Sequence, residues 1–239
     1  MLAAGLLTAL AAIAGGCAED AGGEYFPTRA GMRWEYEISI VTQAGPGGRR
    51  LFVESLGVAR RAGRSFAARR DGEGNVSYYE ERRDGLWRLD ASAGGGQTAL
   101  DAGDRTDSLD PGRKVLGYPL RPGTRWRATE RTVTLEKHTP PHGNLTRLEV
   151  ALELVYRIDA VDETVVVPAG RFERCVRVHA EGEASREVGL YIGAMDVRVE
   201  VTRWYAPGVG LIKAVRREST SEPTLPFGEY TLVLTRLRR

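Results

Sequence analysis

LTRLEVALELVYRID, residues 145–159, is the most regular β-pattern in this chain of 239 residues. Apolar side chains recur there at every second position: Leu148, Val150, Leu152, Leu154, Tyr156 and Ile158. Because side chains alternate between the two faces of a strand, all of these lie on one face. Such a long apolar face needs cover, which a curved sheet provides by closing on itself or by binding a ligand. The stretch therefore predicts a long strand in an antiparallel β protein.

Shorter alternating runs fill much of the remaining chain, and sequences typical of turns separate them. Asp84-Gly85 and Pro207-Gly208 are examples, because glycine adopts the positive φ angles that tight turns require. Strands are predicted at residues 34–40, 51–60, 64–70, 75–82, 86–89, 124–137, 164–167, 172–179, 197–204 and 229–236. Residues 185–195 fit a helix or a strand. We therefore predict a mainly β fold, an antiparallel meander of about 11–12 strands that forms a strongly curved sheet, a half-barrel or an open barrel.

An internal repeat divides the chain. FPTRAGMRW, residues 26–34, returns as YPLRPGTRW at residues 118–126, with an aromatic residue, Pro, Arg, Gly, Arg and Trp in register. Between the two copies, residues 91–112 are rich in Gly, Asp and Ser and show no apolar periodicity, which predicts a surface loop. We expect one mostly β domain over residues 24–239, with related halves at 24–90 and 113–239.

The repeat places a tryptophan, Trp34 or Trp126, at the start of a strand in each half. Large aromatic side chains dominate protein cores, so we interpret both tryptophans, together with Tyr156, as core residues. The alternative is that these aromatic side chains face a bound ligand.

The chain starts with an apolar run that contains no Lys or Arg and ends at Cys17. The run is too short for the roughly 20 residues of a bilayer span, and Ala14-Gly15-Gly16-Cys17 resembles a bacterial lipobox. This resemblance implies a helical signal peptide over residues 1–16, an acylated Cys17 and a lipid-anchored tether over residues 17–23. Ala18 after the cysteine, in place of Asp, implies an outer membrane lipoprotein that faces the periplasm. An Ala-rich helix buried at the front of the domain is the alternative.

Charge and cysteine content limit the function classes. The 34 Lys and Arg residues nearly balance the 32 Asp and Glu residues, and a net charge of +2 gives no field that would attract nucleic acid. Arginines are scattered through the predicted strands with carboxylates between them, so we interpret them as solvated faces. Cys175 has no disulfide partner once Cys17 carries lipid, and a lone cysteine in a short apolar strand packs as a small hydrophobe.

Patterns typical of enzymes and metal sites are sparse. The sequence contains neither the G-x-S-x-G motif of hydrolases nor the H-E-x-x-H motif of zinc proteases. His138 and His142 flank two prolines, which prevent the helix that would bring both imidazoles to one face. His179 stands alone in a predicted strand. Aspartates recur every three residues without the frame of an EF-hand, which favours a solvated loop over a calcium site, at Asp101, Asp104, Asp107 and Asp110.

We therefore expect no enzymatic activity, no cofactor and no metal. An enzyme that uses the acidic loop with His138 or His142 is the least favoured alternative, because no nucleophile can be paired with a base.

Motifs made of turn and core residues carry a resemblance to a known family. They are Tyr25-Phe26-Pro27 followed by Gly31 and Trp34, Pro168-Ala169-Gly170-Arg171-Phe172 followed by Cys175 and Val178, and Trp204-Tyr205-Ala206-Pro207-Gly208-Val209-Gly210-Leu211. Through these motifs, most of the mature chain resembles an uncharacterised family of bacterial lipoproteins. The resemblance implies a fold and a compartment and no catalytic residue. A lipidated curved sheet is also similar, at the level of the fold, to the half-barrels of the lipoprotein carriers and receptors LolA and LolB.

Two functions follow as hypotheses. The first is a non-enzymatic lipoprotein, held at the membrane by its N-terminal lipid, whose curved sheet binds a lipid-like or other hydrophobic ligand. The second is a structural or assembly protein of the cell envelope that acts through contacts with another envelope protein. An open cavity in the interior of the sheet would favour the first hypothesis.

Overall fold

The computed structural model describes residues 21–43, 45–61, 63–89, 112–139, 144–147, 149–187, 194–223 and 227–239. The predicted signal peptide, Cys17 and almost all of the loop predicted at residues 91–112 lie outside these residues. Within the described part of the chain, no helix has the length and apolar character needed to cross a bilayer.

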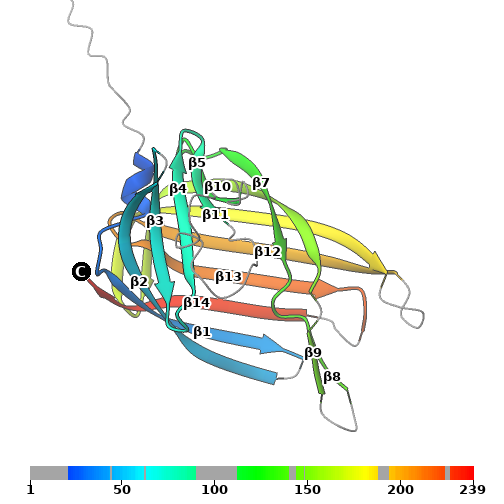
Figure 1. Ribbon diagram of the computed structural model, residues 1–239. Coiled ribbons are helices and arrows are strands. Elements are labelled where there is room, and N and C mark those ends of the chain that lie inside the picture. The colour runs from blue at the N-terminus through cyan, green and yellow to red at the C-terminus, as the bar shows by residue number, and fades with distance from the viewer. Residues whose placement is uncertain are drawn as a thin grey trace, which may run out of the picture.

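Strands make up almost all of the described structure (Figure 1). A short 3-10 helix, η1 (Ala21–Tyr25), precedes them. The strands of the first part are β1 (Arg33–Thr42), β2 (Gly45–Arg61), β3 (Arg64–Asp71), β4 (Val76–Arg82), β5 (Gly85–Leu89) and β6 (Arg113–Gly117). The others are β7 (Arg125–Arg131), β8 (Glu136–Thr139), β9 (Asn144–Arg147), β10 (Ala151–Val167), β11 (Gly170–Glu187), β12 (Ala194–Ala206), β13 (Gly210–Thr220) and β14 (Phe227–Arg238).

Among the described residues, twelve strands form one antiparallel sheet in the order β6-β5-β4-β3-β2-β1-β14-β13-β12-β11-β10-β7. Strands β8 and β9 form a separate hairpin that projects from the sheet (Figure 1). The large sheet curves until its edge strands, β6 and β7, approach each other. There, Nε1 of Trp126 on β7 donates a hydrogen bond of 3.2 Å to the carbonyl of Lys114 on β6. The sheet is therefore a nearly closed barrel, which confirms the predicted mainly β meander.

Each copy of the internal repeat leads into the first strand of a six-strand meander. Trp34 lies in β1, and β2 to β6 follow across the sheet in chain order. Trp126 lies in β7, from which β10 to β14 continue until β14 pairs with β1. Both copies turn at a glycine with positive φ, 82° at Gly31 and 89° at Gly123, a conformation that other residues rarely adopt. The repeated sequence thus marks two corresponding starting points around the barrel.

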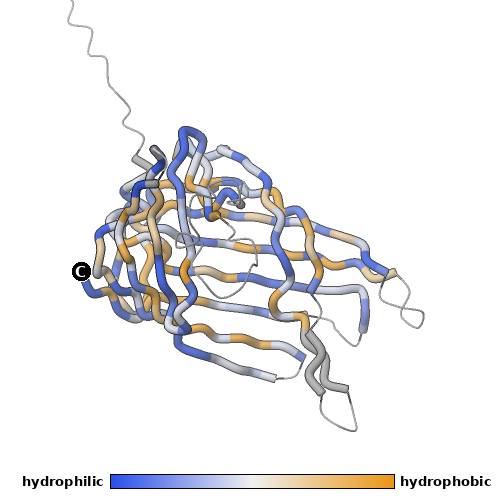
Figure 2. The backbone as a smooth tube through the Cα atoms, viewed as in Figure 1, coloured by the Kyte–Doolittle hydropathy of each residue, from blue (hydrophilic) through white to orange (hydrophobic). Residues whose placement is uncertain are grey.

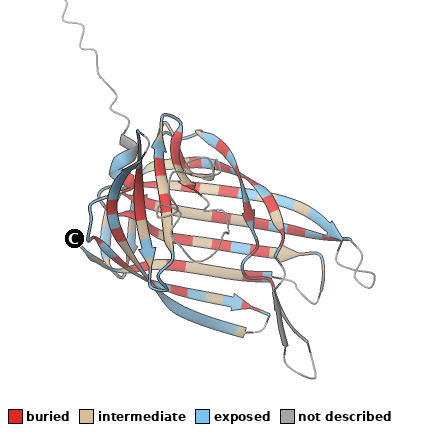
Figure 3. Cartoon of the chain, in the orientation of Figure 1, coloured by how far each residue is buried: buried red, intermediate tan, exposed pale blue. Residues whose placement is uncertain are grey.

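The inner face of the barrel carries the apolar core. Leu154, Tyr156 and Ile158 of β10 pack there with buried residues of β11 and β12. A second cluster combines Trp34 and Ile38 of β1 with residues of β13 and β14. Figure 2 shows apolar and hydrophilic residues alternating along the strands, and Figure 3 shows that burial alternates in a similar way. The alternation that predicts the strands therefore also places the core.

The segment between η1 and β1 packs into one end of the barrel. Phe26 lies against Tyr79, with the ring centroids 4.6 Å apart. The guanidinium of Arg69 lies 3.7 Å from the centre of the Phe26 ring and 4.4 Å from that of Trp34. Its Nη2 donates a hydrogen bond of 3.1 Å to the carbonyl of Pro27. Aromatic and cation–π contacts therefore hold this segment in place.

The structure corrects the two strands predicted at residues 124–137 and 145–159. Each is interrupted, because residues 132–135 and 149–150 separate β7 and β10 from the β8–β9 hairpin. At the interruption, the backbone N–H of Val150 donates to Oγ1 of Thr132 at 2.9 Å. The backbone N–H of Thr132 still donates to the carbonyl of Val150 at 3.0 Å. A side-chain acceptor therefore replaces one of the two backbone bonds of this pair, which the apolar periodicity does not reveal.

Strand β6 changes the boundary between the predicted halves. The sequence places the start of the second half at residue 113, but residues 113–117 pair with β5 of the first meander. Five residues are too few to show an apolar period, so the sequence does not assign them to either half. Their pairing with β5 does.

Candidate functional site

A cavity of about 980 Å³ lies inside the barrel. Arginines provide much of its lining: Arg49, Arg88, Arg113, Arg131, Arg203 and Arg216. Among the described residues that line it, Glu130 alone carries a carboxylate. The rest of the lining consists of Ile40, Thr129, Val133, Thr134, Ala151 and Tyr230. The side chains of Arg49 and Arg131 are largely exposed, whereas Glu130 and Arg216 are buried, so the cavity runs from solvent to a charged interior.

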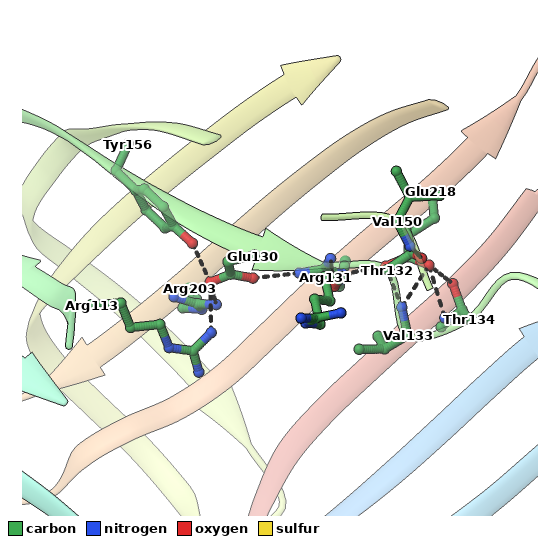
Figure 4. A network of polar contacts seen from close by, with 11 residues as sticks. Arg113, Glu130, Arg131, Thr132, Val133, Thr134, Val150, Tyr156, Arg203 and Glu218 are labelled. Atoms are coloured by element: carbon green, nitrogen blue, oxygen red, sulfur yellow. Dashed lines mark hydrogen bonds and ion pairs between the residues drawn. The ribbon is translucent and has the colours of Figure 1, made fainter. Parts of the chain in front are cut away.

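Glu130 is the centre of the buried charges (Figure 4). Its Oε1 accepts a hydrogen bond of 2.8 Å from Nη2 of Arg203, and its Oε2 accepts one of 2.5 Å from Nη1 of Arg216. The hydroxyl of Tyr156 also donates to Oε1. Nη1 of Arg113 lies 3.5 Å from the same oxygen. Because Glu130 lies on β7 and its partners lie on β6, β10, β12 and β13, these contacts join opposite walls of the barrel.

The surrounding arginines determine the ionisation of Glu130. Burial alone would raise the pKa of its carboxyl group, but the charges of Arg203, Arg113 and Arg216 outweigh burial and hold this pKa well below its usual range. Burial and the charge of Glu130 raise the pKa of the Tyr156 hydroxyl. At neutral pH the group therefore consists of one carboxylate, its guanidinium partners and a neutral phenol that donates a hydrogen bond.

A second buried carboxylate, Glu218 of β13, binds the backbone at residues 133–134 (Figure 4). It accepts hydrogen bonds from the backbone N–H groups of Val133 and Thr134 at 2.9 Å and 2.8 Å, and from Oγ1 of Thr134 at 2.8 Å. Nε of Arg216 donates to it at 2.5 Å. Glu218 therefore places Val133 and Thr134 in the wall of the cavity and fixes the orientation of Arg216.

Four arginines point into the cavity from the inner face and are called the inner arginines here: Arg88, Arg113, Arg203 and Arg216. Among the described residues, Arg88 and Arg113 have fewer close hydrogen-bond partners than Arg203 and Arg216. Arg88 and Arg113 are direct partners on β5 and β6, so their side chains leave the sheet on the same face. Nε of Arg88 is buried and has no hydrogen-bond partner among the residues that the structure describes. Arg203 and Arg216, in contrast, bind Glu130 at 2.8 Å or less.

The aromatic residues singled out in the sequence are buried. Trp126 stacks on Tyr156, with ring centroids 5.2 Å apart and planes 10° apart. Nε1 of Trp34 donates a hydrogen bond of 2.8 Å to the carbonyl of Val209. None of these three residues lines the cavity, although Tyr156 reaches Glu130 through its hydroxyl.

The other candidate residues lie away from the cavity or outside the described part. Cys17, His142 and the side chain of His138 are outside it, as are Asp101, Asp104, Asp107 and Asp110. His179 is half-buried on β11, with Nδ1 3.3 Å from Oγ1 of Thr202. The described residues contain no group of three or more His, Cys, Asp or Glu side chains that could hold a metal ion.

Cys175 is a buried free cysteine, which confirms its interpretation as a packing residue. Its Sγ lies 3.5 Å from the carbonyl of Phe172. Burial raises the pKa of the thiol to about 11. The side chain therefore stays protonated at neutral pH, whereas a nucleophilic cysteine requires a thiolate.

The buried charges were not predicted. The interpretation of the arginines as solvated faces is wrong for Arg203 and Arg216, whose side chains are only 18% and 7% exposed. The sequence does contain one sign of the buried charges. Arg216 and Glu218 follow Ile212 and Ala214 at the same two-residue period, on the buried face of β13. A charge at such a position indicates a buried ion pair, but the partner on β7 becomes visible only in the folded sheet.

Comparisons with known proteins show similarity in structure. A candidate lipoprotein from Parabacteroides distasonis is 12% identical, with a TM-score of 0.43 over 90% of this chain and 98% of that chain. A candidate exported protein with a YmcC-like fold from Bacteroides fragilis is 13% identical, with a TM-score of 0.42 over the same shares. No protein-family model matches the chain, and no curated protein matches its sequence. Similarity at this level transfers no functional residue to this chain.

Proposed function

We propose that this protein is a non-enzymatic lipoprotein of the cell envelope that binds a ligand inside its barrel. Lipid on Cys17 anchors it at the periplasmic face of the outer membrane. The observation that carries the ligand-binding part is the cavity of about 980 Å³ within the nearly closed sheet. Ligand sites commonly occupy the mouths of β-barrels, with volumes of roughly 300–1,000 Å³.

The charges in the interior support a function inside the barrel. Desolvating an ion pair costs several kcal/mol, and well-packed apolar residues often stabilise a core as well or better. A protein that acted only through its outer surface could hold the same walls together with apolar side chains in place of Glu130, Arg203 and Arg216. An interior that must hold a ligand accounts for both the charges and the unfilled space.

The anchor is tested by metabolic labelling with a fatty acid, followed by membrane fractionation of the wild type and the Cys17→Ser variant. We expect the label and the membrane association to disappear in the variant. A wild-type protein that remains in the aqueous fraction with residues 1–16 still attached would contradict the anchor.

The ligand is tested by native mass spectrometry of the Cys17→Ser chain, purified from the periplasm without detergent. We expect a non-covalent mass that dissociates on collisional activation. Ala151→Trp, which fills the cavity, should lower the occupancy, whereas Ala59→Trp on an exposed position of β2 should leave it unchanged. A clean mass of the empty protein in every sample would contradict a ligand-binding function.

An assembly function is a second candidate, favoured by exposed apolar side chains on β2. Phe52, Leu56 and Val58 expose 47%, 42% and 55% of their surface. Apolar side chains grouped on an outer surface are typical of contacts with other proteins. Under this function, Phe52→Ser and Val58→Ser would weaken cross-linking to a defined envelope partner and leave the mass of any interior ligand unchanged.

A further inference from the structure

We infer that the cavity binds an anionic head group of charge −2, of the phosphate monoester type, attached to an apolar body, with Arg88 and Arg113 as its main contacts. This inference rests on the proposed function, because it names the chemical class of the ligand inside the barrel.

The charges of the described residues that surround the cavity do not balance. Among these residues, the four inner arginines bring four positive charges, whereas Glu130 and Glu218 bring two negative ones. The two outer arginines of the lining, Arg49 and Arg131, have carboxylate partners at 3.6 Å and 3.8 Å outside the cavity. Uncompensated charge in a partly enclosed space is costly. The excess of two positive charges therefore matches a ligand group with two negative charges.

The excess is located at Arg88 and Arg113. Like charges directly opposite each other on neighbouring strands are destabilising, and these two residues are such a pair. Within the described part of the chain, Nε of Arg88 is buried without a partner, and Arg113 reaches Glu130 only at 3.5 Å. Both guanidinium groups therefore keep donors for another acceptor. The terminal oxygens of a phosphate can accept from two guanidinium groups at once, which would relieve the repulsion between them.

The remaining lining accommodates an apolar body. Ile40 and Tyr230 are direct partners on β1 and β14, and Val133 and Ala151 complete this part of the wall. The volume of about 980 Å³ far exceeds the size of a phosphate group. The site therefore fits a phosphorylated amphiphile better than free phosphate.

Isothermal titration calorimetry on the full-length Cys17→Ser chain tests this inference with octyl phosphate, inorganic phosphate and octyl glucoside as probes. The variants are Arg88→Gln and Arg113→Gln. The matched control is Arg127→Gln, which removes an exposed arginine that pairs with Glu153 at 2.9 Å on the outer side of the sheet.

Octyl phosphate should bind once per chain and more tightly than inorganic phosphate or octyl glucoside. Each cavity variant should weaken its binding by about 10- to 100-fold, because a charge-assisted hydrogen bond is lost. Arg127→Gln should bind it as the wild type does. Octyl glucoside should bind all variants equally, since its head group carries no charge.

Thermal unfolding separates binding from a structural role. Without ligand, Arg88→Gln should unfold at the same temperature as the wild type or higher. The substitution removes the repulsion with Arg113, and it breaks no hydrogen bond between Nε and a described residue. Octyl phosphate should raise the unfolding temperature of the wild type by more than that of the variant, because the variant binds it more weakly.

Two results would overturn the inference and leave the proposed function standing. One is octyl phosphate binding that does not change in either cavity variant, and the other is tighter binding of octyl glucoside than of octyl phosphate. Inorganic phosphate that binds as tightly as octyl phosphate would refute the apolar body. Failure of every probe, together with a clean mass of the empty protein, would refute the proposed function as well.

Discussion

The carboxylate of Glu218 replaces a strand partner for the backbone at residues 133–134. Both backbone N–H groups there donate to it, and no neighbouring strand of the described sheet pairs with them. The same carboxylate binds Arg216, which in turn binds Glu130. One side chain therefore supports both the course of the backbone and the charged wall of the cavity.

We expect Glu218→Gln to lower the free energy of unfolding by about 3–5 kcal/mol, because a buried ion pair loses one partner. Glu229→Gln is the matched control, since Glu229 pairs with Arg217 at 2.9 Å on the surface, and it should cost at most about 1 kcal/mol. Urea denaturation followed by circular dichroism measures both values. Equal losses in the two variants would show that Glu218 does not have the role described.

The thiol of Cys175 provides a second prediction at this scale. In the Cys17→Ser chain, a thiol reagent should react with Cys175 very slowly in the native state, because the side chain is buried and its pKa of about 11 leaves little thiolate. In guanidinium chloride, which unfolds the protein, the same reaction should be fast and complete. Rapid native labelling without loss of structure would contradict the packing role.

At the level of elements, side chains close the seam between β6 and β7. Trp126 lies so close to Gly117 that an added Cβ would be 2.5 Å from Cε3 of the indole. Besides the hydrogen bond from this indole to Lys114, the ion pair between Arg113 and Glu130 also crosses the seam. The barrel thus depends on the absence of a side chain at residue 117.

Gly117→Ala should therefore destabilise the fold by about 1–3 kcal/mol, since the indole must move and the seam must open. Gly47→Ala in β2 is the control, because a Cβ there meets nothing within 4 Å. Its effect should stay within about 0.5 kcal/mol. Comparable melting temperatures for the two variants would contradict closure by Trp126.

At the level of the whole molecule, the interior links stability to pH. The folded-state pKa of Glu130 lies below its value in an unfolded chain, so the ionised group stabilises the fold above about pH 4. As pH falls below this value, the unfolded state takes up the proton first, and the contribution of Glu130 is progressively lost.

Glu130→Gln should accordingly lower the free energy of unfolding by about 3–5 kcal/mol at neutral pH, because Arg203 and Arg216 lose their common charged partner. The difference in the free energy of unfolding between the wild type and this variant, called the gap here, should narrow below about pH 4, by at most about 1.4 kcal/mol per pH unit. Urea denaturation across this pH range measures the gap. A gap that stays constant would show that Glu130 titrates normally in the folded protein.

Local patterns predicted the strands well and the site poorly. The alternation over residues 151–158 lies within one strand, so it is visible without knowledge of the fold. The break at residues 132–135 depends on Glu218, which is more than 80 residues away. Arg203 and Glu130 are likewise separated by 73 positions. No short window of the sequence contains both members of such a pair, so the sequence does not show which residues meet.

Alternating apolar residues and turn glycines specify a mainly β meander with core aromatics at Trp34, Trp126 and Tyr156, because strand and turn preferences act over a few residues. Closure of the sheet, and with it the charged cavity, is a property of the folded chain. It requires β6 to meet β7 and Glu130 to meet Arg203 and Arg216 across the interior. Electrostatic balance in a buried space depends on which distant side chains converge there, and only the assembled barrel determines that.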